Sequence, residues 1–176
     1  MGFNKYDNTV RAGDVTIVTW DNRYATGLEL VDDQHRQLVV LANELYRACR
    51  LGKKELHSVF SEAMHRMVEY VRFHFTAEQE MLQCIRYPDY LKHKNEHDSL
   101  IKDILEAAKE YDEGRKFVPN QFVRTLKDWV FGHIAVTDRI YSMYVSEQMK
   151  KGLLTLKDIE SCQIVREGNF NPLLHQ

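Results

Sequence analysis

The chain has 176 residues and a formal net charge of −2, with 24 basic and 26 acidic side chains mixed along its length. A chain of this size can form one domain with its own hydrophobic core, and no basic region stands out that would bind nucleic acid or an anionic membrane. No apolar run approaches the roughly 20 residues that cross a bilayer, and the amino terminus has no apolar signal core. We therefore expect a cytoplasmic protein without membrane or nucleic-acid partners.

In chain order, a head of residues 1–30 comes first. Its stretch "DVTIVTW" (residues 14–20) alternates apolar and polar side chains, which predicts a short strand. Four helical patterns follow, and they end at glycines or begin and end near prolines, which stop or start helices. The predicted helices are Asp33–Arg50, Lys54–Ile85, Tyr90–Asp112 and Pro119 to Lys150 or Lys151.

The tail, residues 153–176, contains "TLKDIES", which predicts a short helix capped by Thr155 and Asp158. The following "CQIVRE" (residues 162–167) could form a strand that pairs with the head. Helices of comparable length joined by short connections pack antiparallel. The sequence therefore predicts an all-α fold, an antiparallel up-down-up-down four-helix bundle over residues 31–152 with short amino- and carboxy-terminal extensions.

Three cysteines, Cys49, Cys84 and Cys162, are widely spaced and form no CxxC pair. We expect them to be reduced, partly buried thiols rather than metal ligands.

Polar side chains stand on the apolar faces of all four predicted helices. On the last helix the face runs through Leu126, Trp129, Val130 and His133 to Ile140 and Tyr144. The metal-ligating candidates on the first three faces are His35, then His74 and Glu78 one turn apart, then His93 and His97 one turn apart. Burying an imidazole without a partner costs roughly 1 to 3 kcal/mol, and an unpaired carboxylate costs more. A cation among these side chains would remove that cost.

Each feature alone has an ordinary explanation. A single His35 fits a core or capping histidine, His93 and His97 fit a solvated face, and His74 with Glu78 fits an i,i+4 contact. Their combination on four helices favours a metal site. The remaining histidines, His57, His65 and His175, do not share these faces and are expected at the surface.

The ligand set favours two metal ions over one. It contains no thiolate, and with Asp138 it offers five imidazoles and two carboxylates, more than one tetrahedral zinc can use. Imidazole with carboxylate suits iron or manganese, and carboxylates can bridge two ions. Two octahedral ions offer about twelve positions, of which the imidazoles, two bridging carboxylates and a bridging oxide or hydroxide fill all but about one.

The stretches "GLELVDDQH", "HFTAE", "HKNEH" and "WVFGHIAVTD" resemble the hemerythrin family, in particular the bacterial hemerythrins, over about residues 20–150. The resemblance implies an oxo- or hydroxo-bridged pair of iron ions. His93, His97 and His133 would hold one iron, His35 and His74 the other, and Glu78 and Asp138 would bridge them. Trp129, Val130 and Ile134 would line an oxygen pocket, although core packing alone also accounts for them.

The function implied by this resemblance is reversible dioxygen binding, for storage, delivery or sensing, rather than catalysis. A diiron oxidase or peroxidase is the main alternative, and a sensor module that acts on a protein partner through the head or tail is another. Manganese or a mixed metal pair also stays open.

The spacing of His133 and Asp138 makes a structural prediction. Five residues of a regular helix turn about 500°, which leaves Asp138 roughly 140° around from His133. If both side chains reach the same metal pair, the helix must widen, so we predict a π-type turn between them.

Overall fold

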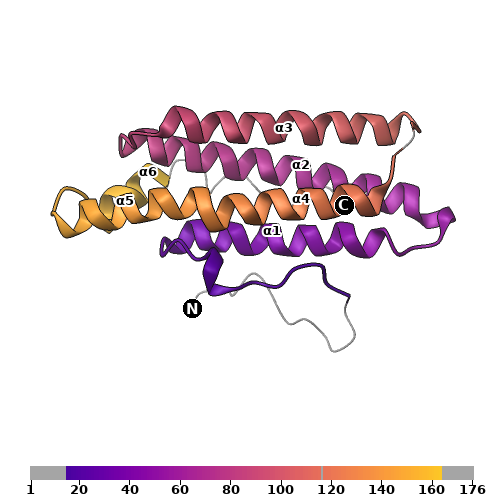
Figure 1. The fold of residues 1–176 in the computed structure, drawn as a ribbon, viewed down its shortest axis with the longest axis horizontal. Coiled ribbons are helices and arrows are strands. Elements are labelled where there is room, and N and C mark those ends of the chain that lie inside the picture. The colour runs from indigo at the N-terminus through magenta and orange to yellow at the C-terminus, as the bar shows by residue number, and fades with distance from the viewer. Residues whose placement is uncertain (1–14, 116, 164–176) are drawn as a thin grey trace.

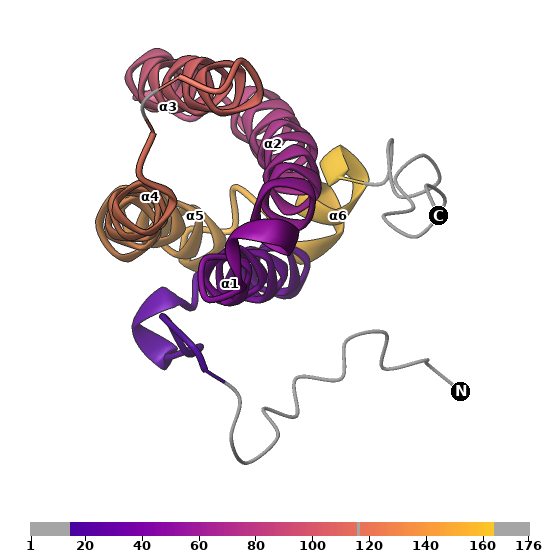
Figure 2. The same cartoon turned by 90° about the vertical axis from the view of Figure 1, so that its right-hand side faces the viewer.

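The computed structural model describes residues 15–115 and 117–163, and within these ranges it is helical without strands. Three long helices, α1 (Glu29–Ala48), α2 (Lys53–Cys84) and α3 (Tyr90–Asp112), are followed by a fourth built from α4 (Pro119–His133), η2 (Ile134–Asp138) and α5 (Arg139–Lys150). Successive helices run in opposite directions (Figure 1) and follow one another around a common axis (Figure 2). The predicted all-α four-helix bundle is confirmed. None of the described helices is long and apolar enough to cross a membrane.

The start of α1 lies four residues before the predicted position because a buried carboxylate organises the turn ahead of it. Asp32 accepts hydrogen bonds from Thr26 N at 2.7 Å, Thr26 Oγ1 at 2.8 Å and Gly27 N at 3.2 Å. Gly27 has a φ of 81°, a conformation that favours glycine. The sequence pattern gave no indication of this turn, because its stabilising contact comes from a polar side chain inside the helix.

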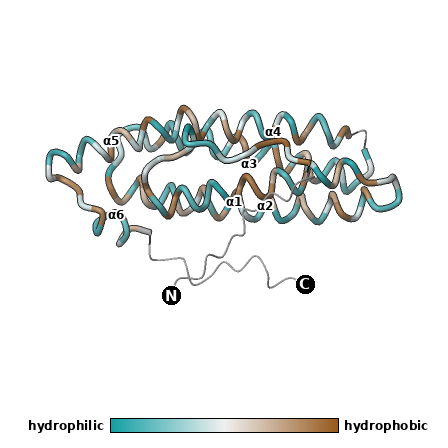
Figure 3. The backbone as a smooth tube through the Cα atoms, turned by 90° about the horizontal axis from the view of Figure 1, so that it is seen from below, coloured by the Kyte–Doolittle hydropathy of each residue, from teal (hydrophilic) through white to brown (hydrophobic). Residues whose placement is uncertain are grey.

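Apolar positions recur at intervals along each long helix (Figure 3), and the buried ones form two clusters. The larger cluster fills the end of the bundle that contains Leu38, Phe60 and Leu126. The smaller one fills the other end and contains Val31, Leu82 and Tyr141. The predicted metal-ligating residues lie near the boundary between these two clusters.

The fourth helix contains the predicted π turn, η2, over Ile134–Asp138. The extra residue in this turn changes which side of the helix each later residue faces. Tyr141 and Val145 are therefore 0% and 2% exposed, whereas Ile140 is 50% exposed. The expectation that Ile140 continues the buried face was wrong, since it followed the regular helical spacing past the widened turn, whereas Tyr144 is half-buried and packs against the smaller cluster.

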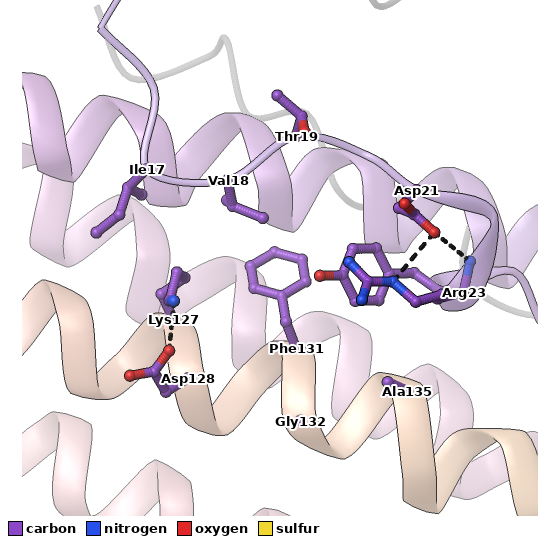
Figure 4. Close-up of a pocket in the computed structure, with 11 residues that line it drawn as sticks. Ile17, Val18, Thr19, Asp21, Arg23, Lys127, Asp128, Phe131, Gly132 and Ala135 are labelled. Atoms are coloured by element: carbon purple, nitrogen blue, oxygen red, sulfur yellow. Dashed lines mark hydrogen bonds and ion pairs between the residues drawn. The ribbon is translucent and has the colours of Figure 1, made fainter.

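The head does not form the predicted strand over its described part, residues 15–20. It is held instead by the side chain of Asn43 on α1, whose Oδ1 accepts from Ile17 N at 2.8 Å and whose Nδ2 donates to Val18 O at 2.9 Å. The arm then passes through the short helix η1 (Asn22–Tyr24) beside α4. In Figure 4, Phe131 of α4 points toward this arm, and its ring lies 5.2 Å from that of Tyr24. A side-chain amide thus satisfies backbone groups that a strand partner would otherwise have to satisfy.

The described part of the tail contains α6 (Leu156–Gln163), which confirms the predicted short helix. Asp158 accepts from Thr155 N at 2.8 Å and from Thr155 Oγ1 at 2.6 Å, and Thr155 Oγ1 accepts from Asp158 N at 3.2 Å, as a capping box requires. The first two residues of "CQIVRE" belong to this helix, and the rest lies outside the described residues.

The expectation of reduced cysteines was wrong for two of the three. Cys84, the last residue of α2, forms a disulfide with Cys162 on α6, and the two Cα atoms are 6.1 Å apart. Their separation of 78 residues gave no signal in the sequence, because α6 meets α2 only in the folded chain. Cys49 is a free, half-buried thiol, and burial raises its pKa to about 11.

Candidate metal centre

The structure places all seven predicted ligand residues in two adjacent buried groups. One group is His93, His97, His133 and Asp138, and the other is His35, His74 and Glu78. Within each group, one ligand atom of every residue lies within 4.8 Å of the others. His57 and His65 are exposed as expected, and His175 lies outside the described residues.

Helical geometry brings these side chains together. His74 and Glu78 on α2, and His93 and His97 on α3, are pairs four residues apart and so share a face. His133 and Asp138 are five residues apart, and η2 fits an extra residue into the turn, so five residues come closer to one full turn and both side chains face inward. The π turn is therefore the local structure that completes the site.

The two carboxylates stand between the two groups. Asp138 Oδ1 lies 3.1 Å from His133 Nε2 and 3.6 Å from His93 Nε2, while its Oδ2 lies 3.4 Å from His35 Nε2. Glu78 Oε2 lies 3.2 Å from His93 Nε2 and 3.3 Å from His97 Nε2. Each carboxylate thus reaches residues of both groups, which is the arrangement that a bridging ligand needs.

Several polar atoms of the site are buried without a hydrogen-bond partner among the described residues. They are both nitrogens of His35, Nδ1 of His93, Oε1 of Glu78 and both oxygens of Asp138. Buried polar groups in proteins are normally satisfied, and unpaired carboxylate oxygens are especially costly. Lone pairs of this kind at the centre of a His/carboxylate cluster fit a pair of cations, so the residues present fit the metals that the sequence predicted.

The electrostatics keep most of the imidazoles neutral. Burial, followed by the charge of His74, lowers the pKa of His35 to about 3. Burial is also the main cause that lowers the pKa of His74 to about 4 and that of His97 to about 2. Neutral imidazole is the metal-binding form, so these three side chains are ready to bind a metal at neutral pH.

The two carboxylates differ because they repel each other in a buried space. Burial and the charge of Glu78 raise the pKa of Asp138 to about 6. Burial also opposes the ionisation of Glu78, but its hydrogen bond with His93 and the nearby imidazoles outweigh that effect and hold its pKa well below the ordinary value. Divalent cations between the two groups would favour the charged form of both carboxylates.

Sequence reasoning missed the residues that support the imidazoles from outside. Gln34 Oε1 lies 2.9 Å from His74 Nδ1, Gln79 Nε2 lies 3.2 Å from His97 Nδ1, and Glu96 Oε2 lies 3.1 Å from His133 Nδ1. Each of the three is the sequence neighbour of a predicted ligand on its own helix. That adjacency was the available signal, because a residue next to an inward-facing ligand points toward the neighbouring helix.

Aromatic and aliphatic side chains cover the His133 side of the centre. Trp129 stacks on His133 with ring centroids 4.8 Å apart, and Phe75, which was not predicted, stacks on His97 at 3.6 Å. Val130 and Ile134 are buried in the larger cluster, and Trp129 packs against it. These contacts are those of core packing, and they also make the His133 side of the centre apolar.

Comparison with known proteins identifies the family. The sequence model of the hemerythrin HHE cation binding domain matches residues 26–145. The chain belongs to the hemerythrin family. It is 32% identical over 127 residues to the bacteriohemerythrin of Clostridium acetobutylicum, covering 69% of this chain and 96% of the relative. It is 27% identical over 133 residues to that of Methylococcus capsulatus, covering 75% and 99%.

Solved hemerythrin structures share the fold. A crystal structure of wild-type hemerythrin superimposes with a TM-score of 0.68 at 27% identity, covering 72% of this chain and 96% of that one. The hemerythrin match includes all seven candidate ligands and Cys84. It ends before α6 and Cys162, so the disulfide joins the matched bundle to a segment beyond it.

Proposed function

We propose that this hemerythrin-family protein binds dioxygen reversibly at a non-haem diiron centre, for storage, delivery or sensing. The observation that supports this best is the position of Asp138, whose two oxygens face different groups of buried histidines. A single-ion site would not need a carboxylate in that position. The proposed ligands of one iron are His93, His97 and His133, those of the other are His35 and His74, and the proposed bridges are Glu78 and Asp138.

The protein's own residues have three tasks in this proposal. The neutral imidazoles would hold the ions, and the two carboxylates would balance their charge. An ion held by His35 and His74 would have one protein ligand fewer than its neighbour and so could bind dioxygen. Trp129, Val130 and Ile134 limit the access of water to the centre. An iron pair bound there would supply the two electrons that reversible dioxygen binding requires.

Anaerobic purification followed by metal analysis and optical spectroscopy tests this proposal. We expect two irons per chain and an absorption band that develops in air and disappears under argon. Asp138→Ala should lose both iron and the band, whereas His65→Ala, at an exposed histidine, should keep them. Iron content well below two per chain in the wild type, or a band that air produces but argon cannot reverse, would refute the reversible carrier.

We also propose a binding role rather than an enzymatic one. The two groups of ligands are surrounded by packed side chains of the bundle. One surface pocket lies apart from them, between the arm and α4. Sustained consumption of a reductant by the iron-loaded protein in air, at a rate proportional to its concentration, would instead indicate a diiron oxidase or peroxidase.

A further inference from the structure

Glu96 occupies a position on α3 between two candidate ligands, His93 and His97, but it points away from the centre of the site. Its Oε2 lies 3.1 Å from Nδ1 of His133, on the opposite side of that imidazole from Asp138. The same oxygen accepts a hydrogen bond of 3.1 Å from Thr137 Oγ1. The carboxylate side chain is 35% exposed, so it joins a buried imidazole to the protein surface.

The π turn places both partners of Glu96. In a regular helix Thr137, four residues after His133, would share its inward face. In η2 it is Asp138 that turns inward, and Thr137 lies at the side, where its hydroxyl reaches Glu96. The widened turn thus directs Asp138 toward Nε2 of His133, and it places Thr137 where its hydroxyl holds Glu96 next to Nδ1.

The corresponding partners of the other supported imidazoles are neutral amides, Gln34 for His74 and Gln79 for His97. A carboxylate that accepts the Nδ1 proton of a ligand histidine fixes the tautomer with Nε2 toward the metal and makes the imidazole a stronger donor. We propose that Glu96 is a positioning residue of the metal centre, which holds His133 as the most electron-donating imidazole of the three-histidine group. This inference rests on the proposed function.

Two variants separate geometry from charge. Glu96→Gln keeps an acceptor for Nδ1 but loses the charge, and Glu96→Ala loses both. Glu106→Gln, at an exposed carboxylate on the same helix, is the matched control. Cobalt(II) affinity measured against a competing chelator is expected to fall about 10- to 100-fold in Glu96→Ala. In the iron-loaded protein, Glu96→Gln is expected to raise the reduction potential, because a weaker donor stabilises the ferric state less.

Thr137→Val should shift the potential in the same direction but less, since the carboxylate remains while its anchor is lost. The role of Glu96 would be overturned if the cobalt affinity of Glu96→Ala and the reduction potential of Glu96→Gln both equalled those of Glu106→Gln. A wild-type protein that binds neither cobalt nor iron would instead refute the proposed function, and this inference with it.

The disulfide carries a second inference that does not depend on the metal. Cys84 is exposed, Cys162 is half-buried, and together they hold α6 against the end of α2. Among the described side chains of α6, only Ile159 is fully buried, at 2% exposure. An isolated helix of eight residues is only marginally stable, so α6 depends on this tether and on one apolar contact.

The position of α6 connects it to the metal centre. Ile159 belongs to the smaller buried cluster, which also contains Tyr141 and Leu82. The centroid of the Tyr141 ring lies 5.6 Å from that of His93. Burial, followed by the charges of Glu78 and Asp138, raises the pKa of the Tyr141 phenol. Figure 2 shows α6 outside the ring of bundle helices, next to α2. Its release would open to water the cluster that closes this end of the site.

We infer that Cys84–Cys162 is a reducible clamp that fixes α6 over the end of the bundle that the smaller cluster fills, next to the metal centre. A dithiol reductant transfers two electrons and two protons to the S–S bond, which yields two thiols and leaves the reductant as a disulfide. Disulfides in a reducing compartment are commonly transient and regulatory. A cytoplasmic location, as the sequence predicted, would therefore make the state of this clamp follow the thiol balance of the cell.

Thiol counting and hydrogen–deuterium exchange test the clamp on the full chain. Denatured, unreduced protein should show one reactive thiol, Cys49, and three after reduction. Reduction or Cys162→Ser should speed amide exchange in residues 156–163 by about tenfold or more, and should also speed exchange in residues 138–145. Cys49→Ser should leave both segments unchanged.

Three reactive thiols in carefully oxidised protein, or equal exchange in residues 156–163 before and after reduction, would overturn the clamp. Faster exchange confined to residues 156–163 would overturn its link to the smaller cluster and the metal centre. All of these measurements can be made without metal, so their failure is distinct from failure of the proposed oxygen binding.

Discussion

Acidification should destabilise the metal-free protein by about 5 kcal/mol between pH 7 and pH 5, before a smaller offset from His133. The folded state holds the pKa of His35 at about 3, that of His74 at about 4 and that of His97 at about 2, chiefly through burial. An imidazole in the unfolded chain takes up a proton near pH 6.5, which favours the unfolded state by about 2 kcal/mol at pH 5. Because all three folded-state values lie below pH 5, the three contributions amount to about 6 kcal/mol.

Asp138 offsets part of this loss. Burial and Glu78 raise its pKa to about 6, so the folded state takes up a proton between pH 7 and pH 5, which returns about 1 kcal/mol. The raised pKa of His133 acts in the same direction: burial opposes its charging, but Asp138 Oδ1, 3.1 Å from its Nε2, and the nearby carboxylates of Glu78 and Glu96 outweigh that. The stabilisation by the neutral imidazoles is thus complete above about pH 6.5 and is lost as the pH falls toward about 3.

Urea unfolding followed by helical circular dichroism at pH 7, 6 and 5 measures this effect on chelator-treated protein. His74→Gln removes one buried imidazole and should reduce the loss between pH 7 and pH 5 by about 2 kcal/mol. His57→Gln, at an exposed histidine, should leave the loss unchanged. Equal unfolding free energies at pH 7 and pH 5 would show that these imidazoles are not buried in the neutral form.

Three further predictions follow from other parts of the structure. Glu78→Ala should lose bound metal while its melting temperature without metal stays close to that of the wild type; a fully metallated variant would contradict the bridging role. Leu45→Ala, at a 0% exposed position of the larger cluster, should lower the free energy of unfolding by about 2–5 kcal/mol, and a loss below 1 kcal/mol would argue against tight packing there. Arg86, after the end of α2, has a φ of 55°, a backbone conformation that favours glycine. Arg86→Gly should therefore raise the free energy of unfolding, measured by urea titration, by about 1 kcal/mol. A decrease would show that the Arg86 side chain stabilises the turn.

The bundle and the grouping of its polar residues could be predicted from the sequence because both follow from helical periodicity. His74 with Glu78 and His93 with His97 stand one turn apart on otherwise apolar faces, so burial of those faces brings them together. The π turn could also be predicted, since the spacing of His133 and Asp138 is incompatible with a shared face on a regular helix.

Features that depend on contacts between distant segments could not be predicted in the same way. Asn43 holds the arm through a side-chain amide, and Cys162 reaches Cys84 only because α6 packs beside α2. The exposure of Ile140 is a different case, because it follows from the predicted π turn once the phase shift is carried forward. The support of His133 by Glu96 needed the relative position of α3 and η2, which periodicity does not give.

The layer of histidines and carboxylates divides the hydrophobic core into two parts. The larger cluster lies on one side of the layer and the smaller cluster on the other, and each of the four long helices passes through both. Without metal, the layer contributes buried polar atoms that lack partners and little apolar contact between the two sides. The two ends should then unfold as partly independent cooperative units, the smaller end first. Metal ions that bind residues of all four helices would join them into one unit, so metal loading would change the cooperativity of unfolding as well as its midpoint.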